Sequence, residues 1–208
     1  MFNKIRPYFL LAIIITALFG CFFMHEAKSK DVIDKRFDTA MITVLRHEGG
    51  LSDTKGDPGG WTNFGISLRF LKDARICENG DCKGDANEII HLTQTEADAI
   101  YYKNWYMKYH YNNINNVKVM TKIMDFSINA GANECHKLVK RAINAVVTPE
   151  ITVNGIMDEN TIEIINLIEP SVFHDAFEHE QEEFYTELVK RNPHLRLFLN
   201  GWLARSRD

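Results

Sequence analysis

The residue types best suited to acid–base chemistry gather in one glycine-rich segment. It runs from Glu48 to Gly65 and reads EGGLSDTKGDPGGWTNFG, with Asp57 nine positions after Glu48 and Thr62 five positions after Asp57. Cleaving a glycosidic bond needs a carboxylic acid that protonates the leaving oxygen and a second group that acts on the opposite side of the sugar. The spacing makes a glycosidase site one hypothesis. A surface carboxylate beside a generic turn is the alternative.

Each of these three residues has a predicted role. Glu48 ends a predicted helix, where its charge would face the negative end of the macrodipole, and we expect Leu45 and Phe64 as apolar neighbours that disfavour the ionised form. Asp57 lies in a polar turn and is expected to stay ionised, while the Thr62 hydroxyl could hold a water. Since a loop of eight residues separates Glu48 from Asp57, we expect the carboxylates about 6.5–9.5 Å apart, a separation typical of inverting enzymes.

The elements that must position these residues are predicted to be mostly helices. Apolar residues recur at helical spacing up to Glu48, and Thr93 to Glu96 is a capping-box pattern that opens an aromatic helix. Further helices are predicted at about 117–130, 133–146, 158–168, 171–190 and 194–205. Only the glycine-rich segment and Thr152-Val153 invite extended structure. The predicted fold class is therefore mainly α, with at most a small hairpin.

The N-terminus resembles an export signal. Lys4 and Arg6 precede an apolar run from Tyr8 to Met24 that contains no charged residue. Its 17 residues are at the low end of what spans a bilayer and longer than most cleavable signals. Three outcomes stay open: a retained membrane anchor through residues 8–24, cleavage after Ser29, or lipidation of Cys21. In each of them the body after Lys30 lies outside the cytoplasm.

Charge and cysteine content limit the partners. Residues 31–208 carry 20 basic and 27 acidic side chains, and such a body repels phosphate backbones, so no nucleic-acid partner is expected. Cys77 and Cys82 flank the turn-rich sequence ENGD, which makes a local disulfide one expectation in an oxidising compartment, while zinc would need two further ligands. Cys135 lies in a helical pattern and is expected to be a small buried side chain.

Two motifs carry a family resemblance. HEGG at residues 47–50 and DPGGWTNFGI at residues 57–66 closely resemble the opening of glycoside hydrolase family 108, whose members are peptidoglycan muramidases. The resemblance implies a lysozyme-like catalytic domain without metal or cofactor. It also implies that Glu48, Asp57 and Thr62 are the catalytic residues.

The C-terminal half carries a second resemblance. DFSINAG at residues 125–131, KRAIN at 140–144 and VNGIMDENT at 153–161 resemble the predicted peptidoglycan-binding domain that usually follows this catalytic domain. The two resemblances imply residues 1–30 as signal anchor or signal peptide, 31–124 as catalytic domain and 125–208 as a helical, peptidoglycan-binding-like region.

Three more residues are candidates for substrate binding. Trp105 is the predicted sugar-stacking side chain among the aromatic residues that follow Tyr101, although aromatic residues at helical spacing more often belong to a core. Asp125 and Asn129 lie four positions apart and share a predicted helix face, towards the cleft. Packing between helices explains these two residues equally well.

The predicted function is that of a peptidoglycan hydrolase. It would cut the β-1,4 bond between N-acetylmuramic acid and N-acetylglucosamine in glycan strands, for lysis or for secretion-linked wall remodelling. We expect a monomer that is either anchored in the inner membrane and facing the periplasm or secreted to the periplasm. A lytic transglycosylase, which needs only one catalytic Glu, and a non-catalytic peptidoglycan-binding secretion factor are the alternatives.

Overall fold

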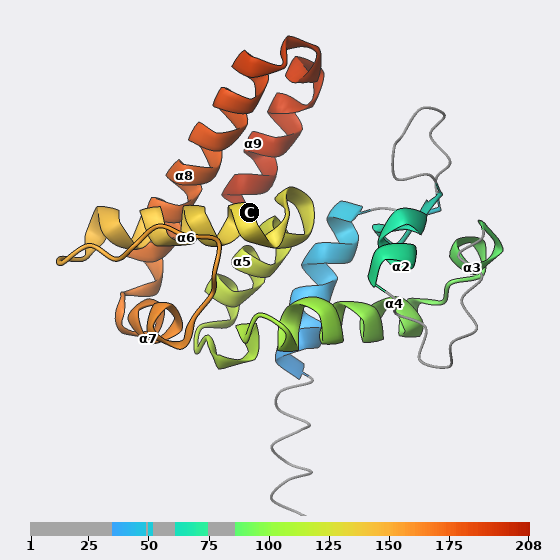
Figure 1. Cartoon of the computed structure of the whole chain (residues 1–208), viewed down its shortest axis with the longest axis horizontal. Coiled ribbons are helices and arrows are strands. Elements are labelled where there is room, and N and C mark those ends of the chain that lie inside the picture. Colours follow the sequence, from blue (N-terminus) through green and yellow to red (C-terminus); the bar gives the residue numbers. More distant parts are fainter. Residues whose placement is uncertain (1–34, 49, 52–60, 75–85) are drawn as a thin grey trace, which may run out of the picture. The chain divides into compact units, whose positions relative to one another are not determined.

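The computed structural model describes most of the chain after residue 34. The described residues are 35–48, 50–51, 61–74 and 86–208 (Figure 1). Residues 39–208 form one compact unit, and residues 1–38 are a second unit of which only 35–38 are described. The predicted domain division at residues 30 and 124 stays a prediction.

Several predicted features lie outside the described residues. They are the apolar segment 8–24, Asp57, and the cysteines Cys77 and Cys82. Within the described part of the chain, no helix combines the length and the apolar character needed to cross a bilayer. The anchor, the second carboxylate and the disulfide therefore remain expectations from the sequence.

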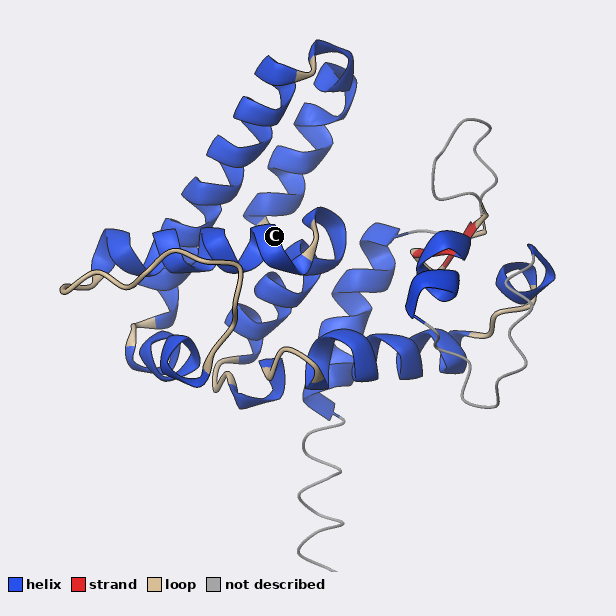
Figure 2. Ribbon diagram, viewed as in Figure 1, coloured by secondary structure: helices blue, strands red, loops and turns tan. Residues whose placement is uncertain are grey.

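Helices dominate the described residues, which confirms the mainly α prediction (Figure 2). A first helix covers residues 35–48. The helices that follow are α2 (Leu68–Ala74), α3 (Ala86–Ile90), α4 (Gln94–Tyr101), the π-helical segment η1 (Tyr102–Met107), the 3₁₀ turn η2 (Tyr111–Asn113), α5 (Val117–Ala130), α6 (Ala132–Val146), α7 (Glu159–Leu167), α8 (Pro170–Arg191), the 3₁₀ segment η3 (Pro193–Phe198) and α9 (Leu199–Arg207). The predicted helix at 194–205 is thus divided into η3 and α9, and Thr152-Val153 is irregular instead of forming a strand.

The helix starts follow local capping chemistry. Thr93 accepts a hydrogen bond from the Glu96 amide, and the Glu96 carboxylate accepts one from the Thr93 amide, so the predicted capping box is present. Asn116 caps α5 in the same way by accepting from the Val119 amide. These caps satisfy amides that have no partner within the helix.

A two-residue hairpin is the only sheet in the described part of the chain. Strand β1 (Thr62–Asn63) pairs antiparallel with β2 (Ile66–Ser67), with Asn63 opposite Ile66. The connecting residues Phe64 and Gly65 both have positive φ, 50° and 77°. Two positive φ values give a turn whose twist matches that of the strands, and glycine adopts this conformation without steric cost.

The core of the unit 39–208 lies between long helices. The first helix buries Ala40, Met41 and Val44, spaced to share one helix face. Helix α5 contributes Phe126, whose ring packs edge-on against Phe177 of α8 at 5.7 Å. The predicted small buried cysteine is confirmed, since Cys135 of α6 is fully buried with a free thiol.

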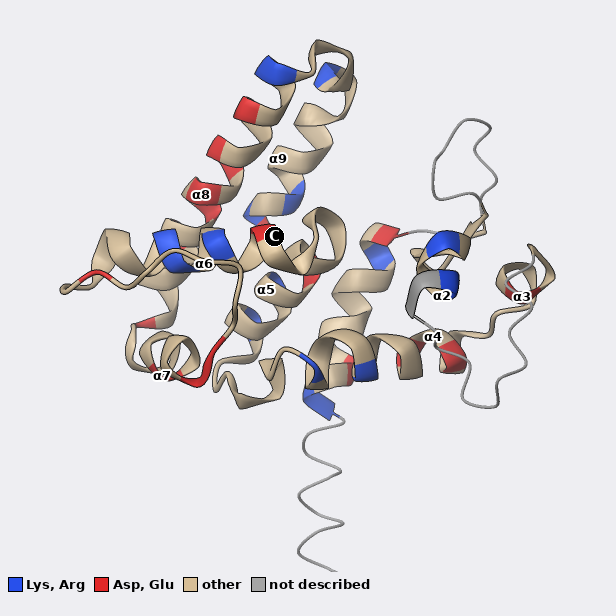
Figure 3. Ribbon diagram, in the orientation of Figure 1, with Lys and Arg blue, Asp and Glu red and all other residues tan. Residues whose placement is uncertain are grey.

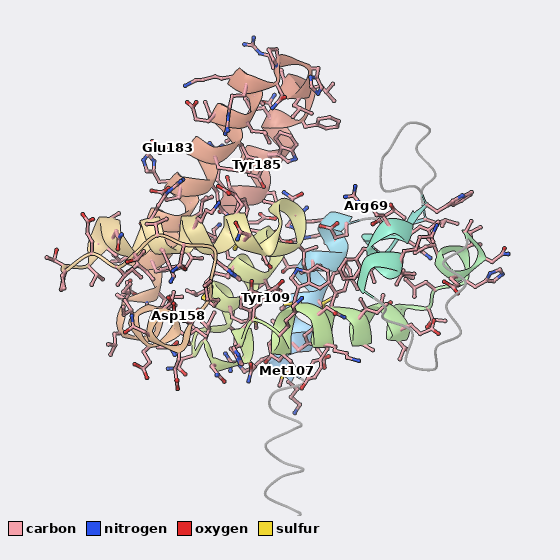
Figure 4. The ribbon with its side chains drawn as sticks, in the orientation of Figure 1. Arg69, Met107, Tyr109, Asp158, Glu183 and Tyr185 are labelled. Carbon is pink, nitrogen blue, oxygen red and sulfur yellow. The ribbon has the colours of Figure 1, made fainter. Side chains whose placement is uncertain are left out.

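A buried lysine ties the loop before α7 to helix α6. Lys140 Nζ donates to Asp158 Oδ2 at 2.8 Å and to Asn154 Oδ1 at 3.0 Å (Figure 4 labels Asp158). Asp158 also caps α7 by accepting from the Thr161 amide at 2.8 Å. Burial raises the pKa of Asp158, but hydrogen bonds from Lys140 and Thr161 outweigh it and lower the pKa to about 2.

We predict that Asp158→Ala lowers the free energy of unfolding at pH 7 by about 2 kcal/mol, since it removes a helix cap and the partner of a buried ammonium. This value allows for solvent screening, because the Asp158 side chain is partly exposed. Because the folded pKa is depressed, the carboxylate stabilises the fold fully above about pH 4. This contribution is lost as the pH falls towards 2, so the difference between variant and parent should shrink over that range. Urea denaturation measures both effects.

Glu159→Ala is the matched control, because it removes the same charge from an exposed neighbouring residue. Equal destabilisation by the two substitutions would show that the Lys140 pair contributes nothing specific.

Candidate active site

Glu48 lies where the glycine-rich hairpin meets the first helix. It is the last residue of that helix, and its side chain is 16% exposed. A Cβ atom added to Gly65 would lie 2.7 Å from Cβ, Cγ and Oε2 of Glu48. A side chain at position 65 is therefore excluded while Glu48 keeps this position. The two sequence motifs, EGG and TNFG, come into contact at this point.

The hairpin is held in place by two side chains. Asn63 is buried and donates to the carbonyl oxygen of Ile89 at 3.0 Å. The Tyr101 hydroxyl donates to the Phe64 carbonyl oxygen at 2.8 Å. Burial, and next the negative charge of Glu48, raise the pKa of Tyr101, so this hydroxyl keeps the proton that it donates. Helices α3 and α4 thus fix the turn that faces Glu48.

The carboxylate of Glu48 is paired with an arginine from the far end of the chain. Arg205 of α9 donates through Nη2 to Glu48 Oε1 at 2.6 Å, and through Nε and Nη2 to both carboxylate oxygens of Asp125 at 2.8 Å. Burial lowers the pKa of Arg205, but the bonds to Asp125 and Glu48 outweigh it and raise the pKa above its ordinary value. We expected apolar neighbours around Glu48, whereas the structure pairs it with a guanidinium.

Further ionic contacts extend this arrangement. His47 lies between two acids, with Nδ1 3.2 Å from Asp125 Oδ1 and Nε2 3.2 Å from Asp208 Oδ2. Arg46 also contacts Asp208, at 3.1 Å. We call the set Glu48, Arg205, Asp125, His47 and Asp208 the ion network. It joins the first helix, α5 and α9 around the Glu48 carboxylate.

Thr62 lies in the hairpin, and Trp105 packs against helices beside it, α2 and α4. Thr62 is in β1, on the strand face opposite to the buried Asn63. Trp105 is half-buried in η1, and its ring lies 4.8 Å from that of Phe70 and 5.3 Å from that of Tyr101. Trp105 therefore takes part in packing around the hairpin, and its contact with a sugar stays a prediction.

Asp125 and Asn129 share a face of α5 but have different surroundings. Asp125 is buried, and both its carboxylate oxygens accept from Arg205. Asn129 is an exposed residue whose amide donates to the Tyr185 hydroxyl at 2.6 Å. The packing interpretation thus accounts for the contacts of both residues, and substrate binding by them stays a prediction.

Arg205 is the site residue that sequence reasoning missed. It lies 157 positions after Glu48, in a short helix of sequence LNGWLARSR. Nothing in that local pattern distinguishes Arg205 from Arg207, which instead contacts Glu182 of α8. Only the position of α9 beside α5 and the first helix gives Arg205 its role.

A pocket of about 560 Å³ borders the ion network. His47, Asp125 and Arg205 line one part of it, and Lys122, Ser171 and His174 line another. Glu48 is not among the described residues that line this pocket. The pocket is therefore separate from the carboxylate.

Two family models match the chain, one after the other. Residues 41–131 match the model of the family described as glycosyl hydrolase 108, and residues 136–207 match the predicted peptidoglycan domain. The chain carries a glycosyl hydrolase 108 domain. It is a glycoside hydrolase, and the domain that follows makes it a peptidoglycan hydrolase.

A solved structure shows a similar fold. The structure titled "Structure of Brucella abortus SagA" aligns with a TM-score of 0.67 and 24% sequence identity, over 84% of this chain and 91% of that chain. No curated protein matches the sequence significantly. In this hydrolase the ion network joins the two matched domains, since Glu48 and Asp125 belong to the first and Arg205 to the second.

We predict that Gly65→Ala lowers the rate of peptidoglycan hydrolysis about 100-fold. The added Cβ would displace Glu48 and is strained at a φ of 77°, and a shift of about 1 Å in a catalytic group has effects of this size. Loss of turbidity of a peptidoglycan suspension measures the rate, and circular dichroism verifies the fold.

Gly50→Ala is the matched control, because a Cβ at position 50 would meet no atom of the described residues within 4 Å. A folded Gly65→Ala variant with the activity of Gly50→Ala would contradict the close fit of the hairpin against Glu48.

Proposed function

We propose that the chain is an N-acetylmuramidase. It cleaves the β-1,4 bond between N-acetylmuramic acid and N-acetylglucosamine, and Glu48 is the general acid that protonates the leaving oxygen. The observation that carries the proposal is the contact between Glu48 and the Phe64-Gly65 turn. It joins the acidic residue of the first motif to the strand that bears Thr62.

The proposal assigns the water-directing role to Asp57 and Thr62. Asp57 belongs to the segment that connects Glu48 to β1, and Thr62 is the first residue of that strand. A hydroxyl and a carboxylate can together orient a water for attack on the sugar. Trp105, Asp125 and Asn129 remain the proposed substrate-binding residues.

Arg205 is proposed as a positioning residue for the acid. Its hydrogen bond to Glu48 holds the carboxyl group in one place against Gly65. The acid must carry a proton when it reacts, so its salt bridge to Arg205 must loosen as substrate enters. Asp125 binds the same guanidinium through two oxygens and keeps it in place when Glu48 turns to the glycosidic oxygen.

The proposed location is outside the cytoplasm, where peptidoglycan lies. The charged start and the apolar run at residues 8–24 support either a retained inner-membrane anchor that faces the periplasm or release into the periplasm.

We predict that Glu48→Gln lowers peptidoglycan cleavage by about 100- to 10,000-fold and leaves the fold intact. Glutamine keeps the volume of the side chain but has no carboxyl proton to donate. The turbidity assay measures the rate, and Glu159→Gln, on an exposed residue of α7, is the control. A rate above a tenth of the parent's would exclude Glu48 as the acid.

We predict that the products carry reducing ends and that the α-anomer of the new end appears first, because a bound water attacks the far face of the sugar. Mass spectrometry of the digested glycan and NMR of the fresh products make the two measurements. Products with 1,6-anhydro ends would instead identify a lytic transglycosylase. Initial release of the β-anomer would show retention, and no cleavage at all would favour a binding protein.

A further inference from the structure

Three aromatic rings stack in a row between helices α8 and α9. Tyr185 of α8 stacks on Trp202 of α9 with ring centres 5.1 Å apart and planes 17° apart. Trp202 in turn stacks on Phe198, at 5.6 Å and 30°. We call Tyr185, Trp202 and Phe198 the aromatic ladder (Figure 4 labels Tyr185). It begins at a buried ring and ends at Phe198, which is 48% exposed.

The aromatic ladder leads to the ion network. Trp202 and Arg205 are three residues apart and share one face of α9, and Phe198 is the last residue of η3, directly before α9. With a rise of about 1.5 Å per residue, Trp202 lies about 5 Å and Phe198 about 10 Å from Arg205 along the axis. Arg205 binds Glu48 directly. The exposed end of the ladder is thus about two helical turns from Arg205, the residue that binds the proposed catalytic carboxyl.

Helix α5 connects the other end of the ladder to the same network. The exposed Asn129 donates to the Tyr185 hydroxyl at 2.6 Å. Asp125, one turn earlier on α5, accepts from Arg205. The aromatic ladder and the ion network are therefore supported by the same two helices, α5 and α9.

The surface around the ladder suits an uncharged ligand. Phe198, 48% exposed, presents an aromatic ring to solvent at the end of the ladder. Figure 3 shows acidic residues gathered along α8, while α9 is free of them along its length from Leu199 to Arg207. Aromatic faces pack well against the C–H faces of pyranose rings, because the ring face carries partial negative charge.

We propose that the aromatic ladder is a glycan subsite of the active site. It stacks against a sugar of the strand that is being cut through Phe198, whose ring is supported by Trp202, and so extends the substrate path from Glu48 along α9. The inference rests on the proposed muramidase function. It means that the second domain forms a continuation of the catalytic cleft and does not act as a separate anchor.

Binding is tested without cleavage in the full-length Glu48→Gln chain. The probe is peptide-free glycan strands prepared from peptidoglycan with an amidase. Loss of one stacking contact weakens binding about two- to tenfold, so we expect this increase in Kd for Phe198→Ala and for Trp202→Ala. Trp202→Phe keeps an aromatic face and should restore most of the affinity. Leu197→Ala, next to the ladder and also exposed, is the matched control and should bind as the parent does.

Circular dichroism confirms that each variant is folded. If Trp202→Ala unfolds, Phe198→Ala still decides, because Phe198 is about half exposed and is not part of the buried core. Equal Kd values for Phe198→Ala and Leu197→Ala would overturn the subsite. The muramidase proposal is tested separately, by comparing the cleavage rate of Glu48→Gln with that of the unchanged protein.

Discussion

One guanidinium group holds the proposed catalytic carboxyl within the fold. Arg205 is mostly buried and shared between two carboxylates, Glu48 and Asp125, that belong to different helices. Removing one partner of a buried ion pair usually costs about 3–5 kcal/mol, because a charge is left without compensation. The three helices that supply these side chains are therefore constrained together. A change in the place of α9 changes the surroundings of Glu48.

This ion pair connects the two domains that the sequence matches. The glycosyl hydrolase 108 match ends at residue 131, and Arg205 lies in the peptidoglycan domain that begins at residue 136. The proposed acid, in one domain, thus accepts a hydrogen bond from a cation of the other. A catalytic domain expressed alone would lack this cation. The ion network therefore includes side chains from both matched domains.

The motif residues of the second domain contact side chains of α6. A Cβ on Gly155 would lie 2.0 Å from the Asn133 side chain, and the Gly155 carbonyl oxygen lies 3.0 Å from a ring nitrogen of the buried His136. Asn154 and Asp158 both accept from Lys140. These motif residues therefore hold the loop before α7 against helix α6. The aromatic residues outside the motif are the better candidates for contact with glycan.

Much of the fold was predictable because its signals are local. Helix α5 covers Val117–Ala130 as predicted, and the Thr93 capping box opens α4, since apolar spacing and caps act within one or two turns. The last residues of the glycine-rich segment, Thr62–Gly65, form one strand and the turn of the expected small hairpin, because Phe64-Gly65 adopts a tight turn. The short helices α2 and α3 were not predicted, because a helix of five to seven residues carries too few apolar positions to show a period.

The candidate site divides in the same way. The sequence by itself determined Glu48 as the candidate acid and Thr62 as its candidate partner, because these residues lie within one short motif, whereas the close approach of Gly65 to Glu48 came from the structure. The tertiary structure alone decided that Arg205 pairs with Glu48, that Asp125 serves this arginine, and that Asn129 meets Tyr185. These contacts join residues 56 to 157 positions apart. An ion pair or hydrogen bond over such a distance leaves no periodic trace in the sequence, since it depends only on where the packed helices bring their faces together.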